Sequence, residues 1–158
     1  MKIRTLPAGK NHKQQQGFTY LLILAALVVV GILADVVTQS EIMRLKRDNE
    51  QELLFRGMAY QQAIKSYVKA SRHGKQFPRT LEDLVSDPRF ATKKHLRQAY
   101  KDPITGDDWL LFKDKTGGIT GIASSSKQKP LKQKFFPTGM ESFEDAQHYS
   151  DWVFQYRL

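Results

Sequence analysis

The stretch GFTYLLILAALVVVGILA, residues Gly17 to Ala34, decides the fold of this chain. From Phe18 it runs for seventeen residues without a charge, and eleven of these are Phe, Leu, Ile or Val. Near a bilayer centre each such residue favours insertion by roughly 0.3 to 0.6 kcal/mol. With Val36 and Val37 a helix reaches roughly 30 Å, enough to cross a hydrocarbon core. The sequence therefore predicts a transmembrane segment over residues 18–37.

Two other interpretations fit the apolar stretch less well. A buried helix of a soluble domain would have to be apolar on every side within a small protein. A secretory signal would need small residues at the end of the apolar run, and this run ends in Ile32-Leu33-Ala34-Asp35. A retained transmembrane helix is the better interpretation.

The residues before the apolar stretch are basic. Residues 1–17 contain four Lys or Arg side chains and no acid, and they end in Gln14-Gln15-Gln16-Gly17. Three basic residues, Arg44, Lys46 and Arg47, follow the span. The excess of one basic residue on the amino-terminal side predicts a cytoplasmic amino terminus.

The junction Gly17-Phe18-Thr19, between polar leader and apolar helix, resembles the processing site of type IV pilins and of type II secretion pseudopilins. The resemblance implies that a prepilin peptidase cleaves after Gly17 and that the new terminal Phe18 is N-methylated. It also implies other pseudopilins or pilins and an inner-membrane assembly platform as partners. The expected order is a leader at 1–17, a transmembrane segment at 18–37, a periplasmic helix at 38–73 and a small α+β domain at 74–158.

One position departs from the family pattern. The fifth residue counted from Phe18 is Leu22, where the family usually has a glutamate. A carboxylate in lipid needs a partner, and in pilins the amino terminus of a neighbouring subunit is thought to supply it. Some minor, tip-located pseudopilins also lack this glutamate. The resemblance therefore leaves open whether the subunit is major or minor.

The helix is expected to continue far beyond the membrane. No proline occurs between Asp35 and the seventies, and His73 with Gly74 reads as a basic last turn and a glycine cap, so one helix is predicted from Phe18 to Ser71. Residues 41–52 are expected to be solvated or to face another subunit. Five residues then recur at steps of four and three and form one apolar face: Leu53, Gly57, Tyr60, Ile64 and Tyr67.

The rest of the chain predicts short elements of both kinds. A Thr80–Asp83 capping box opens a short helix over 81–85, and a second is expected over 92–100. Alternation and turn residues predict strands at 109–112, 119–123 and 152–158, with a helical turn within 140–149. So small a sheet needs a cover. The predicted fold class is α+β and pilin-like: a long amino-terminal, transmembrane-to-periplasmic helix packed on a small antiparallel sheet.

The composition and motifs of the chain argue against nucleic-acid binding and against enzymatic activity. Removal of residues 1–17 lowers the Lys and Arg count from 25 to 21, against 16 acidic residues, so much of the net charge of +9 lies in the leader. That argues against nucleic-acid binding. The chain has no cysteine, and the sequence contains neither a nucleophile elbow nor a glycine-rich nucleotide loop. We expect no enzymatic activity and no small-molecule substrate.

Several groups of polar residues can be interpreted as ordinary surface or turn residues, and two of these groups also as binding residues. The histidines at 95 and 148 read as surface residues, and Asp102, Asp107 and Asp108 read as turn residues. Major pseudopilins hold calcium near their carboxyl end, so the resemblance makes Glu144, Asp145 and Asp151 candidate calcium ligands beside simple surface acidity. The lysines between 127 and 134 read as a solvated loop, or as a docking surface for acids on the next subunit.

The expected function is therefore a structural subunit of a type II secretion or type IV pilus-like assembly in the bacterial inner membrane. Its carboxyl-terminal domain would lie in the periplasm, and the short filament that it builds would support protein secretion. A single-pass anchored binding or sensor module that is never processed is the main alternative. A membrane-anchored hydrolase would have to rely on Asp107 and Asp108.

Overall fold

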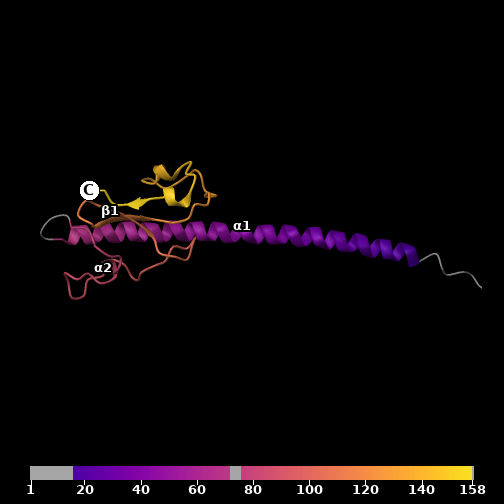
Figure 1. The fold of residues 1–158 in the computed structure, drawn as a ribbon, viewed down its shortest axis with the longest axis horizontal. Helices are drawn as coiled ribbons and strands as arrows, with labels where there is room; N and C mark the ends of the chain where they lie inside the picture. Colours follow the sequence, from indigo (N-terminus) through magenta and orange to yellow (C-terminus); the bar gives the residue numbers. More distant parts are fainter. Residues whose placement is uncertain (1–15, 72–75, 158) are drawn as a thin grey trace, which may run out of the picture. The chain divides into compact units, whose positions relative to one another are not determined.

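The computed structural model describes residues 16–71 and 76–157, without the side chains of residues 16, 17 and 34–38. The chain divides into two compact units, residues 1–43 and 44–158, each described here by itself. Helix α1, Gln16–Ala70, contributes to both units (Figure 1). Its bounds match the expected helix from Phe18 to Ser71 closely. Residues 1–15 of the predicted leader, and His73 with Gly74 of the predicted helix stop, lie outside the described residues.

The first unit contains the apolar part of α1. Its large apolar side chains from Phe18 to Leu33 are all exposed, from 43% for Leu24 to 71% for Phe18. Within the described residues, no helix has the length and hydropathy that a bilayer crossing requires. Positions 34–37 of the predicted 18–37 span have side chains outside the description.

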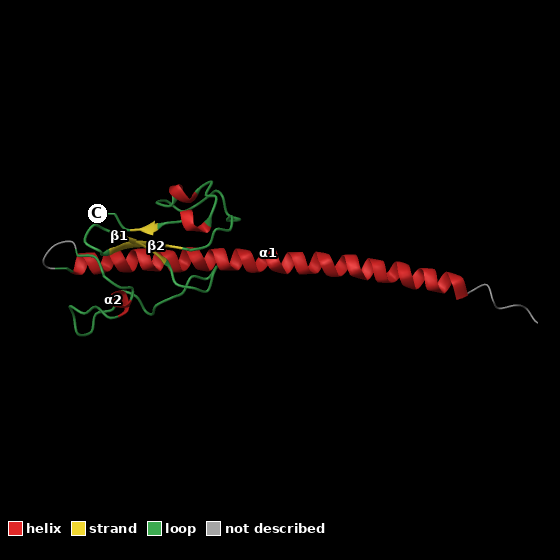
Figure 2. Cartoon of the chain, in the orientation of Figure 1, coloured by secondary structure: helices red, strands yellow, loops and turns green. Residues whose placement is uncertain are grey.

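The second unit contains all the strands that the structure describes. Its elements are α2 (Glu82–Val85), β1 (Leu110–Lys113), β2 (Ile119–Ala123), β3 (Phe154–Gln155) and the 3₁₀ turns η1 (Glu141–Phe143) and η2 (Tyr149–Asp151). The sheet has the order β1-β2-β3, and both pairs are antiparallel (Figure 2). The expected α+β fold, with one long helix and a small antiparallel sheet, is confirmed.

Two short elements differ from expectation. Residues 92–100 form no helix, because the N–H groups of His95 and Leu96 both donate to the carbonyl of Leu84, at 2.8 Å each. The expected strand over 152–158 shortens to β3, because the N–H of Trp152 completes η2 by donating to Tyr149. In both segments, non-local or turn hydrogen bonds occupy backbone N–H groups that the expected helix or strand would have used.

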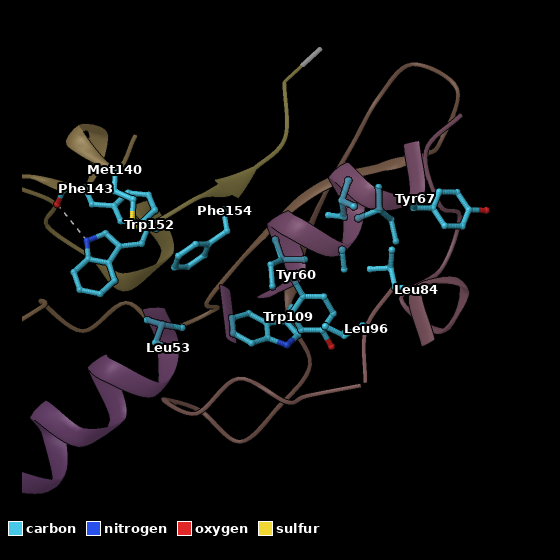
Figure 3. Close-up of a cluster of buried hydrophobic side chains, with 14 of the residues drawn as sticks. Leu53, Tyr60, Tyr67, Leu84, Leu96, Trp109, Met140, Phe143, Trp152 and Phe154 are labelled. Atoms are coloured by element: carbon cyan, nitrogen blue, oxygen red, sulfur yellow. Dashed lines mark hydrogen bonds between the residues drawn. The ribbon is translucent and has the colours of Figure 1, made fainter. Parts of the chain in front are cut away.

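The expected apolar face of α1 forms the centre of the core. Leu53, Tyr60 and Ile64 are fully buried, and Tyr67 is nearly so. Around this face lie aromatic rings from the rest of the unit, including Trp109, Phe143, Trp152 and Phe154 (Figure 3). Aromatic side chains bury large areas and hold preferred edge-to-face geometries, so this cluster accounts for much of the packing between helix and sheet.

Gly57 permits a close approach between α1 and β3. A methyl group added at Gly57 would lie 2.4 Å from the ring of Phe154, which is itself buried. The side-chain amide of Gln61, one turn further along α1, donates to the carbonyl of Gln155 at 2.8 Å. The glycine therefore sets the spacing at which β3 meets the helix.

We predict that Gly57→Ala destabilises the second unit although alanine favours helix by about 1 kcal/mol. The added methyl group must displace the Phe154 ring, and overpacking of this kind costs about 1–3 kcal/mol. Urea unfolding followed by tryptophan fluorescence in detergent measures the change. Gly31→Ala is the matched control, because no atom lies within 4 Å of its added methyl group. Equal midpoints for the two variants would contradict the prediction.

Candidate functional site

Glu50 joins α1 to the carboxyl-terminal third of the chain. It is 5% exposed, although it lies in residues 41–52, which were expected to be solvated or to face another subunit. Its Oε1 accepts hydrogen bonds from the N–H groups of Leu131 and Lys132 and from the hydroxyl of Tyr149, the last at 2.9 Å. Glu50 stands three residues before Leu53, so extending the apolar register one step back would have placed it on the buried face.

The environment of Glu50 is held together by hydrogen bonds alone. No ion pair involves it among the described residues. Burial, and then the hydrogen bond to Glu50, raise the pKa of Tyr149 well above its usual range, so this hydroxyl remains a donor. The arrangement fixes the loop after Pro130 and the η2 turn onto α1.

We predict that Glu50→Ala destabilises the second unit by about 2–5 kcal/mol, because it leaves three donors without their acceptor. Glu50→Gln keeps an acceptor oxygen and should recover part of the loss. Urea unfolding measures both. Glu52→Ala is the control, since the Glu52–Arg56 pair is partly exposed and should contribute less than about 1 kcal/mol. Similar losses at the two glutamates would refute the role of Glu50.

A second polar cluster lies around the buried carboxylate of Asp87. Arg89 binds it through two nitrogens, at 2.9 Å and 2.7 Å, and His95 Nε2 lies 3.0 Å from Oδ2. The guanidinium also donates to the carbonyl of Tyr67 at 2.9 Å and stacks 3.6 Å from the centre of its ring. Nη1 of Arg89 is buried without a hydrogen-bond partner. The cluster fixes the segment after α2 to the carboxyl-terminal part of α1.

His95 is not the surface residue that we expected. Its side chain is fully buried, with Nδ1 2.8 Å from Ser66 Oγ. Ser66, His95 and Asp87 thus share the connectivity of a hydrolytic triad. An acyl-transfer site also needs donors aimed at the developing oxyanion, and the N–H of Ser66, inside α1, is committed to the helix ladder. Arg89 further neutralises Asp87, so we interpret the cluster as structural.

Stability should fall in acid because of Asp87. The hydrogen bonds from Arg89 hold the pKa of this carboxyl far below its usual 3.8, against an opposing effect of burial. A lowered pKa in the folded state stabilises the protein above about pH 3.8, and this contribution is lost as the pH falls further.

We predict that the free energy of urea unfolding falls in the wild type as the pH is lowered from about 5 to about 2.5, and that it falls less in Asp87→Asn. Asp108→Asn, at an exposed aspartate outside the cluster, should keep the wild-type pH dependence. Equal slopes in the Asp87 variant and the wild type would exclude this source of acid sensitivity.

The residues predicted to act in processing lie in the first unit, and the candidate metal ligands lie in the second. Gly17, Phe18 and Leu22 lie on α1 in the first unit, with Phe18 and Leu22 exposed. In the second unit, Asp151 accepts a hydrogen bond from the N–H of His148. No group of three or more His, Asp or Glu side chains among the described residues could hold a metal ion. Calcium binding by Glu144, Asp145 and Asp151 stays a prediction.

The three aspartates named as turn residues separate into two kinds. Asp102 is 1% exposed and accepts bonds from the N–H of Ile104 and the hydroxyls of Thr105 and Ser124. Asp107 and Asp108 are exposed. Asp102 thus holds a turn, as expected, and its carboxylate is occupied by these donors.

A cavity of about 480 Å³ in the second unit was not foreseen from the sequence. Its wall includes the aromatic side chains of Tyr60, Tyr100 and Trp109, and the apolar side chains of Leu81 and Leu111. Tyr60 and Trp109 meet edge to face at 5.7 Å, and the indole N–H donates to the carbonyl of Tyr100 at 2.7 Å. Small-molecule sites have volumes in this range. Five charged residues also line the cavity: Arg79, Glu82, Lys101, Asp108 and Lys113.

Comparisons of the chain with protein families, with curated proteins and with solved structures find no match. Any functional proposal therefore rests on the residues and their arrangement. The features to be explained are an uncovered apolar helix, a packed α+β unit and an open aromatic cavity.

Proposed function

We propose that the chain is a pilin-like structural subunit of a type II secretion or type IV pilus-like assembly in the bacterial inner membrane. In this role a prepilin peptidase removes residues 1–17, and Phe18 is then methylated. The apolar helix first holds the protein in the bilayer and afterwards enters a bundle of like helices. The folded unit remains in the periplasm and builds the surface of a short filament.

The observation that carries the proposal is the exposure of the apolar helix. Every large apolar side chain described between Phe18 and Leu33 is uncovered, on all faces of α1. Water disfavours so large an apolar surface, whereas lipid or neighbouring apolar helices would accept it. The second unit has its own buried core and does not need this segment for packing. A separate environment for the first unit is what a membrane-stored filament subunit provides.

Leu22 bears on the place of the subunit in the filament. An uncharged position in this segment keeps transfer between lipid and helix bundle inexpensive, because no ion must be desolvated. Because Leu22 has no charge, it also cannot form the charge pair that would fix the register of a repeating subunit. Leu22 therefore favours a minor or tip position within the proposed assembly.

An anchored binding or sensor module is the second candidate. The cavity lined by Tyr60, Tyr100 and Trp109 favours it, because a receptor needs a concave apolar site. In that case the Gly17-Phe18 junction would have no role, and the chain would keep its leader.

We predict that co-expression with a prepilin peptidase yields a protein that begins at a methylated Phe18. Intact-mass and amino-terminal mass spectrometry of the membrane fraction measure both changes. Gly17→Val should block cleavage, because the resemblance implies a glycine before the cut, whereas Gly31→Ala should leave cleavage unchanged. A wild-type chain recovered with residues 1–17 still attached would reject the filament-subunit role and favour the anchored module.

A further inference from the structure

A second hollow in the second unit is lined mostly by cationic and polar side chains. It has a volume of about 360 Å³, and its wall consists of Gln62, Lys65, Ser66, Lys69, Ala70 and Lys93. Helix α1 supplies the first five of these residues, and Lys93 comes from the segment that follows α2. Three ammonium groups therefore border one hollow, and no acidic residue lines it. The aromatic cavity, by contrast, has acidic as well as basic residues in its wall.

These three lysines have no acidic partner among the described residues. No ion pair described in the chain involves Lys65, Lys69 or Lys93. The two segments that meet at the hollow are also free of acids, since neither residues 53–70 of α1 nor residues 88–101 contain an Asp or Glu. Like charges held close together repel one another. A bound anion would therefore relieve a repulsion that the chain itself leaves uncompensated.

The end of helix α1 accounts for only one of the three cations. Lys69 lies in the last turn, where a positive charge interacts favourably with the free carbonyl groups. Lys65 lies one turn earlier, and this effect falls off within the last turn. Lys93 lies in no helix, and its ammonium group is 5.1 Å from the centre of the Phe90 ring, a contact that restricts its position. Helix-end electrostatics therefore do not explain why the three lysines converge.

Ser66 adds a hydroxyl group that the interior of the unit holds in place. Its Oγ lies 2.8 Å from Nδ1 of His95, and Nε2 of the same fully buried ring lies 3.0 Å from the carboxylate of Asp87. Ser66 is nevertheless exposed and lines the hollow. The buried network thus places one short, positioned polar group among three long lysine side chains. The side-chain amide of Gln62 supplies further N–H donors at the same wall.

We propose that this hollow, the lysine pocket, binds a phosphate group, with the ammonium groups of Lys65, Lys69 and Lys93 around its oxygens. Lysine binds phosphate as a point charge, whereas a carboxylate is matched best by the paired N–H groups of arginine. No arginine lines the pocket. Three cations also match a group with three terminal oxygens better than one with two.

The pocket is wider than a phosphate group alone, so the ligand extends beyond its phosphate. Ala70 is the one apolar residue in the wall, and this composition favours a hydrophilic remainder. A soluble phosphate ester and the headgroup of an anionic phospholipid both have this chemistry. The inference goes beyond the proposed function, because it does not depend on whether the chain is processed or builds a filament.

The test is calorimetric titration of the full-length chain, in micelles of an uncharged detergent, with inorganic phosphate at constant ionic strength. We expect one saturable site per chain. Lys65→Gln and Lys93→Gln should each weaken binding at least about fivefold, because each removes one charge-assisted hydrogen bond. Lys129→Gln is the matched control, since it removes the same charge from an exposed residue outside the pocket. Absence of saturable binding, or equal weakening in the control and in Lys93→Gln, would overturn the proposal.

Three further titrations test the class of ligand and identify its source. Acetate at the same ionic strength should bind more weakly than phosphate, and acetate binding as tight as that of phosphate would reject the assignment to a phosphate group. Tighter binding of glycerol phosphate, a monoester, would support a soluble phosphate ester as the ligand. Tighter binding of glycerophosphoglycerol, the deacylated headgroup of phosphatidylglycerol, would support a lipid headgroup. A chain that is processed at Gly17 but binds no phosphate would refute the lysine pocket and leave the proposed function standing.

Discussion

The arrangement of the second unit depends on the hydrogen bonds that the carboxylate of Glu50, on helix α1, accepts. One oxygen accepts two backbone donors and one hydroxyl from residues at least 81 positions later in the chain. In a dry interior such an acceptor is strong when it is fully used and costly when it is not. It fixes the loop of residues 127–134 against α1, next to the exposed Phe135.

Helix α1 has a different pattern of apolar residues in each of the two units. From Leu53 onward, α1 has an apolar face through Leu53, Tyr60 and Ile64 that is covered by aromatic rings from the rest of the second unit. Before that point its apolar side chains are uncovered. A helix that is apolar all round requires lipid or other helices, whereas a one-faced helix requires a sheet. The change in pattern along one element thus separates the uncovered segment of α1 from the segment that packs in the folded unit.

Much of the fold could be predicted because its signals are local. The face through Leu53, Gly57 and Tyr60, the hairpin of β1 and β2, and the reciprocal Thr80–Asp83 bonds all follow from residues close together in sequence. The polar contacts were missed because their partners are remote. Nothing near His95 in the sequence indicates that Ser66 and Asp87 enclose it. For the same reason the sequence predicts a helix over 92–100, where the structure has none. The aromatic cavity likewise needs residues from 60 to 113 to meet.

The contact between Gly57 and Phe154 has a consequence for the order of biogenesis. The last strand closes on a helix position almost a hundred residues earlier, and contacts of such long sequence separation form slowly. Closure must therefore wait until residue 154 has been synthesised and can reach the helix. Until then the incomplete unit would expose its aromatic surface, and exposed apolar surface of this kind makes folding intermediates prone to aggregate.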